Sequence, residues 1–333
     1  MSHLLAIDAG GTSTRTMVLD DTARCLGIGR GGRGNPVSEG TVAAAASIAS
    51  ATETALRAAN VTGEQIRSVS LALAGGLSTD AGSDWLTLGL RPLGLTGQIT
   101  VEHDLLALYF SGSYRLCGYG LVAGTGSTAV RVNDGEVDRV IDGLGWLIGD
   151  QGSGFWIGQQ VARAVARALD TRPPGTSMVQ PVLAELGIAP DLRRDHGRAR
   201  ALSGLTRYVY TSSPLSLARL APIAFADPGD PVSIDIVSRA AAGLASMILD
   251  LYDDALAGPL VIGGGVVSAQ PRLFDRIVAT VREGGVTAPV QPVQDGLVGA
   301  GVIALRRAGI AVDADMFTRL QTSAAACATP RPS

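Results

Sequence analysis

The chain has 333 residues, of which 46% are hydrophobic and 17% are charged, and its formal net charge is −3. This length favours two domains over one hydrophobic core, and the composition excludes a disordered chain. A small negative charge without a basic cluster argues against nucleic acid as the main ligand.

The first part of the chain predicts strands and helices in alternation. An apolar run at 4–8 ends at glycines and predicts a strand followed by a tight turn. Alanine-rich sequence at 41–59 predicts a helix. The remaining elements expected before residue 118 are strands at 14–19, 23–28, 68–73 and 99–102, and a helix from 105 to at least 110.

The same pattern then returns. A strand at 119–123 leads into a Gly/Thr loop at 124–128, and Asn133-Asp134-Gly135 is a strong hairpin turn between strands at 129–132 and 137–141. Strand, Gly/Thr loop, strand, turn and strand therefore occur twice, about 115 residues apart, which favours an internal duplication. The alternative is two unrelated hairpins that both carry a Gly-Thr turn.

The second half is mostly helical. Apolar spacing predicts a helix at 155–169, and 170–240 is expected to be mainly helical with breaks at its prolines. The tail from 324 is small, polar and proline-containing, and is expected to be frayed. The other expected elements are helices at 234–256, 271–283 and 297–308 and strands at 259–262 and 290–292.

The loop from Asp8 to Thr14 is the first candidate phosphate site. Its glycines, Gly10 and Gly11, let backbone N–H groups approach an anion, and the hydroxyls of Thr12, Ser13 and Thr14 suit phosphate oxygens. Asp8 ends the preceding strand, where a carboxylate can hold Mg²⁺ through water. The alternative is a tight hairpin turn.

The loop from Gly124 to Thr128 offers the same chemistry, with Thr125, Gly126 and Ser127 as candidates. Two such loops facing each other could bind a triphosphate from both sides. The sequence contains no lysine, which excludes a Walker P-loop and any kinase that needs an invariant lysine. Backbone N–H groups, hydroxyls, a metal ion and arginine must therefore meet the phosphate charge.

Asp104 follows a predicted strand, at the edge of the sheet where α/β proteins place their ligands. A carboxylate there can accept the proton of an attacking hydroxyl. The alternative is a helix N-cap for residues 105 onward. We expect the neighbouring His103 to point away along the strand and to have a structural or surface role.

Three further segments are candidates for ligand contact. Gly143 to Ser153 carries four glycines around Asp150, which suits binding of substrate hydroxyls or of a metal-bound water, or capping of the next helix. Asn35 follows a Gly/Arg-rich stretch and suits hydroxyl recognition or a turn. Gly263 to Gly265 ends a buried strand, where bare backbone could receive a nucleoside or could simply turn. Trp146 and Trp156 are expected to pack in the core.

Together these motifs resemble the N-acetylglucosamine kinase family, within the wider BadF/BadG/BcrA/BcrD ATPase group. The resemblance runs from residue 4 to about 308. The motifs that carry it, in order, are DAGGTST at 8–14, GN at 34–35, LAGG at 73–76, HD at 103–104, AGTGST at 123–128, GDQGS at 149–153 and IGGG at 262–265.

The resemblance implies an α/β fold of two ribonuclease-H-like domains of the actin/hexokinase type with a cleft between them. We expect domains at 1–117 and 118–323, the second with a helical insertion at about 155–258, followed by the tail at 324–333. It also implies that the enzyme uses ATP and Mg²⁺, and closes its domains on the sugar. The expected partners are a small amino sugar, ATP and a second copy of the chain, without nucleic acid or a membrane.

The resemblance assigns roles to individual residues as well. Asp104 matches the catalytic base that deprotonates the sugar 6-hydroxyl, and Thr12 and Thr125 match contacts to nucleotide phosphates. Gly263, Gly264 and Gly265 would lie near the nucleoside. The positions implied for sugar binding are Asn35, Gly76, Asp104, Ser127, Gly143, Gly145 and Asp150.

One position departs from the family pattern. Gln151 stands where the GDEGS motif has glutamate. The change removes a negative charge near the sugar, and a cationic glucosamine would gain from that charge more than a neutral N-acetyl group. The expected reaction is therefore phosphorylation of N-acetylglucosamine at O6, with glucosamine or muramic acid as the alternative substrate.

The cysteines and the motifs argue against several other functions. A BadF-type activator ATPase needs closely placed thiolates for its iron–sulfur cluster, whereas Cys25, Cys117 and Cys327 are scattered. The scatter also argues against a disulfide framework and a zinc site, including the zinc cluster of ROK sugar kinases. A non-catalytic sugar sensor would not need Asp8, Asp104 and Asp150 together. No signal peptide or membrane span is predicted, so we expect a cytoplasmic protein.

Overall fold

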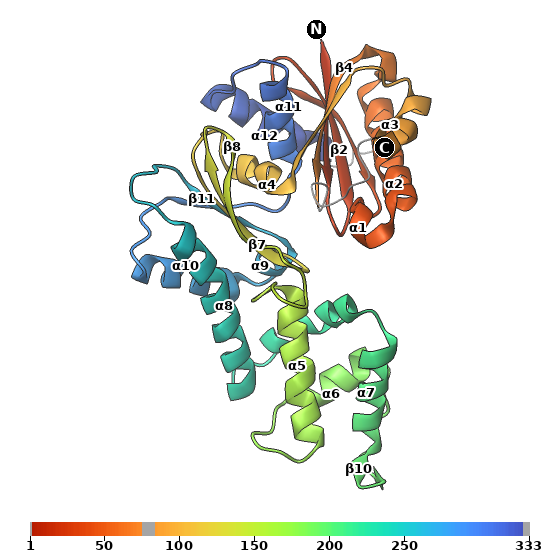
Figure 1. Ribbon diagram of the computed structural model, residues 1–333, viewed down its shortest axis with the longest axis vertical. Helices are drawn as coiled ribbons and strands as arrows, with labels where there is room; N and C mark the ends of the chain where they lie inside the picture. The colour runs from red at the N-terminus through yellow and green to blue at the C-terminus, as the bar shows by residue number, and fades with distance from the viewer. Residues whose placement is uncertain (1, 75–83, 329–333) are drawn as a thin grey trace.

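The computed structural model describes residues 2–74 and 84–328, which form two five-stranded sheets with helices around them (Figure 1). The first sheet has the order β3-β2-β1-β4-β5. Its first three strands form an antiparallel meander, whereas β1, β4 and β5 run parallel. The strands are β1 (His3–Ala9), β2 (Thr14–Asp20), β3 (Cys25–Gly31), β4 (Ile66–Leu73) and β5 (Gln98–His103).

The second sheet repeats this topology. Its order is β12-β11-β6-β7-β8, so β6, β7 and β8 correspond to β1, β2 and β3. Strands β6, β11 and β12 are parallel, and β7 and β8 complete the meander. The shared order supports the predicted duplication. The strands are β6 (Gly118–Ala123), β7 (Ser127–Asn133), β8 (Glu136–Asp142), β11 (Leu260–Gly263) and β12 (Val290–Pro292).

Side chains along β1 point alternately to the two faces of the first sheet, and both faces are covered by helices. Leu5 and Ile7 pack with α2 (Thr41–Ala59) and α3 (Asp84–Leu90), while Leu4 and Ala6 pack with helices on the other face. This is the period-two pattern of a strand buried on both faces. The short elements on the α2 side are α1 (Pro36–Glu39), η1 (Gly63–Gln65) and η3 (Arg91–Leu93).

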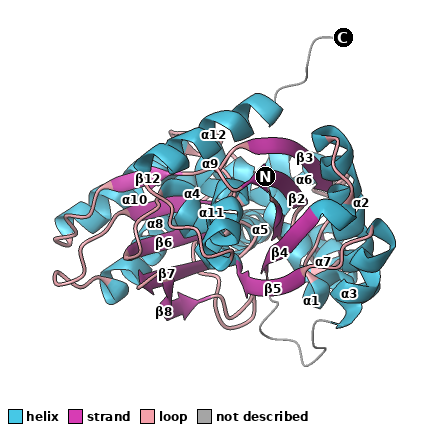
Figure 2. Cartoon of the chain, turned by 90° about the horizontal axis from the view of Figure 1, so that it is seen from above, coloured by secondary structure: helices cyan, strands magenta, loops and turns pink. Residues whose placement is uncertain are grey.

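The helices on the other face connect the two sheets. Helices α4 (Asp104–Gly112) and α11 (Leu297–Arg307) lie between them (Figure 2). Their core includes Val130, Val132 and Val261 of the second sheet as well as residues of the first. Residue 104 is thus the first residue of a helix that packs against both sheets.

The C-terminal helices differ from the expected domain boundaries. Helix α11 packs on β1 and β4, and α12 (Ala314–Ala328) packs on β3. Both helices thus contact strands of the first sheet, although α11 also bonds to the β7–β8 hairpin through Arg306 and Arg307. The expectation of a frayed tail from 324 is also wrong for 324–328, because α12 continues to residue 328 and Ala324 is 5% exposed.

A helical segment extends from the second sheet (Figure 1). It contains α5 (Gly154–Leu169), α6 (Val179–Glu185), α7 (Arg200–Thr211), the 3₁₀ helix η4 (Pro214–Phe225) and α8 (Pro231–Leu251). The sequence analysis did not predict its small hairpin, β9 (Arg194–Asp195) and β10 (Arg198–Ala199). Helices α9 (Gly265–Ala269) and α10 (Pro271–Glu283) follow β11.

Helix α8 is long and apolar enough to cross a membrane, although no membrane span was predicted. Its 18-residue window has a mean hydropathy of 1.5, and 56% of that window is buried inside the protein. Ile236, Leu244 and Ile248 belong to the core of the second half. Core helices of soluble proteins can be equally long and apolar, so we interpret α8 as a core helix.

Candidate active site

Two carboxylates meet at one edge of the first sheet. Asp8 lies near the end of β1, and Asp104 directly follows β5. Because β1, β4 and β5 are parallel, both residues lie at the carboxyl-terminal edge, where α/β sheets bind ligands. The two side chains also interact electrostatically, since the charge of Asp104 raises the pKa of Asp8.

Asp8 is 8% exposed, and its pKa is raised to about 7. Burial is the main cause; Arg15 opposes it, and Asp295 and Asp104 add to it. The Gly296 N–H donates to Asp8 Oδ2 at 3.2 Å, and Arg15 Nη1 lies 3.8 Å from the same oxygen. Asp8 therefore lies in a largely dry, net negative environment, which favours a proton or a cation.

Arg15 and Asp295 were not predicted as site residues. Arg15 pairs directly with Asp8 in the β1–β2 register, and its Nε lies 3.3 Å from Asp295 Oδ2. The hairpin register could have indicated Arg15, because cross-strand neighbours on one face come close. Asp295 is 287 positions from Asp8 in sequence, and only the packing of α11 on the first sheet brings it near.

Asp104 is free of the capping role that was its alternative interpretation. The N-cap of α4 is His103, whose Nδ1 accepts from the Leu105 N–H at 3.3 Å. The same Nδ1 lies 3.0 Å from Asp104 Oδ1, so the expectation that His103 points away is wrong. The turn into the helix at residue 104 ends the strand alternation on which that expectation rested. The Asp104 side chain is 31% exposed and can reach a ligand.

The first glycine loop is closed by two backbone bonds. Gly10 N–H donates to Ser13 O at 3.0 Å, and Gly34 N–H donates to Gly10 O at 3.1 Å, which brings Asn35 beside the loop. Gly11 and Thr12 are exposed. Thr14, in contrast, is fully buried, and its hydroxyl has no hydrogen-bond partner among residues 2–74 and 84–328. Thr14 does not face a ligand here, because it lies in β2 under Gly34.

Asn35 has a structural role that its sequence context also allowed. Its Oδ1 accepts from the Val37 N–H at 2.8 Å and caps the short helix α1. This bond uses the side-chain oxygen and leaves the amide NH₂ as the group able to donate to a hydroxyl.

Several backbone groups of the second glycine loop are already hydrogen-bonded within the protein. Gly124 N–H donates to Gly126 O at 2.9 Å. The first two N–H groups of α5, on Gly154 and Phe155, donate to the carbonyls of Gly124 and Thr125 at 2.8 and 3.1 Å. The start of α5 is therefore occupied by the loop itself. Thr125 remains exposed, so its hydroxyl is available.

Asp150 joins the second loop to the glycine-rich segment that follows β8. Its Oδ1 accepts from the Ser127 N–H at 2.9 Å, and the side chain of Ser127 donates to Gln151 O at 2.9 Å. Asp150 is 5% exposed, and burial raises its pKa, while the Ser127 N–H opposes that shift. It does not cap α5, since Ser153 Oγ accepts from the Trp156 N–H instead.

Asp142 is a residue that sequence reasoning missed. Its Oδ1 accepts from the Asp150 N–H at 2.8 Å and from the Leu144 N–H at 3.3 Å, which closes the loop on itself. Gly143 and Gly145 have φ angles of 73° and 83°, which favour glycine. An aspartate directly before such glycines, with a second aspartate eight residues on, was the available signal.

The loop between Asp142 and Asp150 carries an apolar tip. Trp146 is 41% exposed and packs edge-on against Phe155 at 5.9 Å, so it is not the core residue that was expected. Leu147 and Ile148 are each 75% exposed. Trp156 is partly buried against the hydrophobic core of the second half, as expected, and Arg239 lies over its ring.

The glycines after β11 have different surroundings. A Cβ at Gly263 would lie 2.7 Å from Val293, and one at Gly264, whose φ is 106°, would lie 2.6 Å from the backbone of Ala123. Close packing against the end of β6 therefore explains Gly264. Gly265 is exposed, and nothing lies within 4 Å of a Cβ there. Of these three glycines, Gly265 has the most open surroundings.

The side chain of Gln151 is directed onto α8, because a Cβ at Gly243 would lie 2.6 Å from Gln151 Cγ. Because this amide packs against a helix, Gln151 is weaker support for a neutral sugar than its sequence position suggested. Gly76, the other sugar-binding position implied by the motifs, lies outside the described residues.

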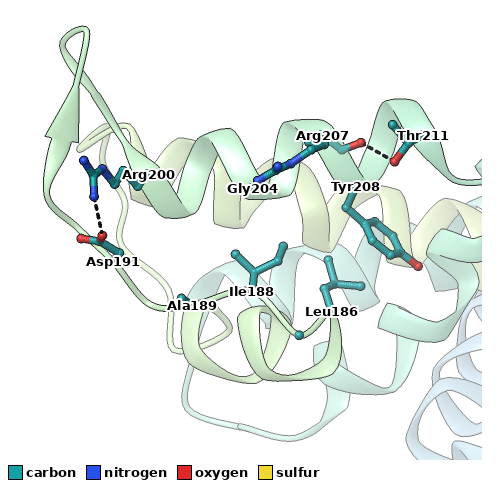
Figure 3. Close-up of a pocket in the computed structure, with 10 residues that line it drawn as sticks. Leu186, Ile188, Ala189, Asp191, Arg200, Gly204, Arg207, Tyr208 and Thr211 are labelled. Carbon is teal, nitrogen blue, oxygen red and sulfur yellow. Dashed lines mark hydrogen bonds and ion pairs between the residues drawn. The ribbon is translucent and has the colours of Figure 1, made fainter.

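A groove of about 440 Å³ lies elsewhere, between the turn after α6 and one face of α7 (Figure 3). Leu186 and Ile188 form its floor, Tyr208 lies at one end, and Arg200 pairs with Asp191 at the other. None of its lining residues is a predicted site residue, so we do not assign the reaction to it.

The chain is similar to known amino sugar kinases along most of its length. It is 28% identical to N-acetyl-D-glucosamine kinase of Dictyostelium discoideum over 323 residues, which cover 90% of this chain and 97% of that protein. It is 24% identical to glucosamine kinase GspK of Vibrio cholerae over 256 residues, covering 76% and 81%.

The fold is also found among solved structures. A protein from Chromobacterium violaceum, described as a proposed N-acetylglucosamine kinase, superposes with a TM-score of 0.70 at 23% identity, over 92% of this chain and 99% of that chain. This likeness confirms the predicted two-lobed α/β fold. A family model described as the BadF/BadG/BcrA/BcrD ATPase family matches residues 5–304. That match spans nearly the whole chain, which therefore belongs to the BadF/BadG/BcrA/BcrD ATPase family.

Proposed function

We propose that this protein transfers the terminal phosphoryl group of ATP to O6 of an amino sugar, with N-acetylglucosamine as the preferred substrate. The observation that carries the proposal is the placement of Asp8 and Asp104 at one edge of the first sheet in a member of an ATPase family. The relatives from Dictyostelium and Vibrio are kinases of N-acetylglucosamine and of glucosamine, which supports an amino sugar as acceptor.

Asp104 is the better candidate for the general base. It is partly exposed and does not cap its helix, and His103 lies beside its Oδ1, which leaves Oδ2 to face a ligand. Asp8 is buried and is bonded to Gly296 and Arg15. Asp104 would accept the proton of the 6-hydroxyl as that oxygen attacks phosphorus.

Asp8 fits the role of holding Mg²⁺ through water. Its buried carboxylate lies near Asp104 and Asp295 with Arg15 as the neighbouring cation, so a divalent ion would relieve charge there. Within 2–74 and 84–328, no three His, Cys, Asp or Glu side chains gather closely enough to ligate a metal directly. Water and phosphate oxygens would complete its coordination. Bound Mg²⁺ would neutralise charge on the phosphates.

The nucleotide and the sugar would use the open groups at the two loops. Gly11, Thr12, Thr125 and Gly265 are exposed and suit contacts to ATP. Gly10, Ser13 and Gly126 shape the loops, as their backbone bonds indicate. For the sugar we propose the amide of Asn35, together with Asp104 and the segment that contains Gly143, Gly145 and Asp150. Ser127 would act mainly by holding Asp150, since its hydroxyl is already donated.

A substrate panel tests the proposal. N-acetylglucosamine, glucosamine, N-acetylmannosamine, muramic acid and glucose are each incubated with the protein, MgATP and a coupled assay of ADP release. We expect the highest kcat/KM for N-acetylglucosamine, and nuclear magnetic resonance of the product should locate phosphate on O6. Phosphorylation of none of the five sugars would overturn the kinase assignment. A preference for glucosamine would overturn only the choice of sugar.

The packing of α11 and α12 on the first sheet supports a proposal for the domains. We propose a first domain of 1–117 together with the helices α11 and α12, and a second domain of 118–296 that includes the helical segment. We also propose that the protein is a homodimer, which light scattering would test, and that it acts in the cytoplasm.

A further inference from the structure

The C-terminal helix α12 holds the edge strand β3 through one stripe of side chains. Arg319, Ser323 and Cys327 are spaced by four residues and so lie on one face of the helix. Arg319 Nη1 donates to Thr22 O at 2.6 Å, and the Cys25 N–H donates to Ser323 Oγ at 2.9 Å. The helix is therefore hydrogen-bonded to the backbone at the start of β3.

The last member of this stripe brings two cysteines together. Cys327 Sγ lies 3.6 Å from the carbonyl oxygen of Cys25, although the residues are 302 positions apart in sequence. Cys25 is 3% exposed and packs in the same core as Leu320 and Ala324, whereas Cys327 is exposed. From their positions in the sequence, all three cysteines were expected to be scattered. That interpretation is wrong for this pair, because sequence spacing does not report the packing of a C-terminal helix.

We propose that Cys25 and Cys327 form a reversible intramolecular disulfide under oxidising conditions, which locks α12 onto the edge of the first sheet. The pair unites a protected thiol with an accessible one, the arrangement of a reactive cysteine and its resolving partner. Cys117 is not part of it, since its thiol contacts Asn133 Oδ1 at 3.3 Å.

The oxidant would be a low-molecular-weight disulfide such as oxidised glutathione. The Cys327 thiolate attacks one sulfur of that disulfide, forms a mixed disulfide and releases one glutathione thiolate. Cys25 then loses its proton and attacks Cys327 Sγ, which forms the Cys25–Cys327 bond and releases the second glutathione. The two protein thiols lose two electrons in all, and the added disulfide gains them.

The second step should be the slow one. Burial, with the Cys327 thiol beside it, raises the pKa of Cys25 far above its usual range. Few Cys25 thiolates are then present at neutral pH. Once formed, the bond would close a loop of about 300 residues and would restrain the unfolded chain strongly. It would also fix the helix that covers an edge strand, an element otherwise prone to pairing with other chains.

The full-length protein provides a direct test. It is incubated with oxidised glutathione, alkylated with N-ethylmaleimide in denaturant and digested with trypsin. Because the chain has no lysine, Cys25 falls in the peptide 25–30 and Cys327 in the peptide 320–333. We expect these two peptides to be recovered joined, two hydrogens lighter than their sum, and separate again after dithiothreitol. Thermal unfolding of the oxidised protein should shift upward by roughly 3 °C or more.

Two variants serve as controls. Cys117→Ser should behave as the unsubstituted protein, and Cys327→Ser should show neither the joined peptides nor the thermal shift. The proposal is overturned if Cys25 remains free for maleimide while Cys327 carries glutathione, or if Cys117 takes part in the bond. The test does not depend on the proposed sugar kinase activity.

Discussion

The two glycine loops arise from the same repeated unit, yet they have different chemistry in the folded protein. The first loop ends β1 with Asp8, a buried carboxylate beside Arg15 whose pKa is raised to about 7. The second loop has Asp150 beside it, and that carboxylate accepts a backbone N–H of the loop. One loop thus contains a buried carboxylate with a raised pKa, and the other is held by a carboxylate from the segment after β8.

The difference arises from the segments that pack against each loop. At the second loop, the N-terminus of α5 donates Gly154 and Phe155 N–H groups to the loop carbonyls. At the first loop the distant backbone donors are single residues instead: the Gly34 N–H donates to Gly10 O, and the Ala74 N–H donates to Ala9 O. Duplicated backbone therefore does not imply duplicated function, and substitutions in and around the two loops can test this asymmetry.

The largest effect is expected at Asp104. Asp104→Asn keeps the size of the side chain but cannot accept the proton of the sugar hydroxyl. We expect kcat to fall by about 10³-fold or more, while the affinity for ATP, measured by calorimetry, stays within about threefold. His103→Gln is the neighbouring control and should lower kcat far less. Near-normal turnover of the Asp104 variant would show that another group acts as base.

Asp8 should make stability depend on pH in an unusual direction. Its folded pKa of about 7 is raised above the unfolded value, so the native state binds the extra proton between about pH 4 and pH 7. This group therefore favours folding below pH 4, and that contribution is lost as the pH rises through 7. Asp8→Asn removes the ionisation, and we expect it to gain stability over the unsubstituted protein by up to about 4 kcal/mol at pH 8.

Urea unfolding at pH 4.5, 6 and 8 without metal or nucleotide measures this difference. The gain should grow with pH, and Mg²⁺ with ATP should reduce it by stabilising only the protein with Asp8. A gain that does not change with pH would contradict the raised pKa. The control variant Asp142→Asn, at the end of β8, should not show the same growth, because that carboxylate accepts from the Asp150, Leu144 and Gln151 N–H groups and its loss should destabilise.

Gly264 and Gly265, directly after β11, allow the effect of close packing to be tested separately from the effect of ligand access. Gly264→Ala places a methyl group 2.6 Å from the Ala123 backbone at φ 106°, a conformation essentially limited to glycine. We expect a loss of about 3 kcal/mol in the free energy of unfolding. Gly265→Ala meets open space and should leave stability within about 0.5 kcal/mol while raising KM for ATP. Equal stability of both variants would contradict the close packing of β11 on β6.

The sequence allowed much of the fold to be predicted, because alternation and glycine turns are local signals. The helix at 41–59 and the strand at 290–292 were predicted to the residue, and the repeat indicated the two matching sheets. The end of helix α12 was missed because its small residues run directly into a proline-containing tail. Its burial against β3 is a long-range effect that no local pattern reports.

The candidate site was less predictable than the fold. Asp8 and Asp104 stand out because each lies at the end of a strand, and strand ends are visible in sequence. Arg15 and Asp295 depend on register and on the return of α11 to the first sheet. Thr14 matched the phosphate motif, yet it is buried under Gly34. A motif identifies a loop, but which of its side chains face a ligand depends on neighbours far away in sequence.

The smallest effect is expected at Asp150. Two substitutions there distinguish a carboxylate that only holds the Ser127 N–H from one whose charge acts on the substrate. Asp150→Asn retains an oxygen for the Ser127 N–H and tolerates the observed φ of 62°, and burial already raises the pKa of the native carboxyl. We expect it to change stability by less than about 1 kcal/mol. Asp150→Ala leaves the buried N–H unpaired and should cost about 1–3 kcal/mol. If instead both variants fold equally well and both lose sugar affinity alike, the carboxylate acts directly on the substrate, and the two halves of the repeat are more alike in function than their hydrogen bonds indicate.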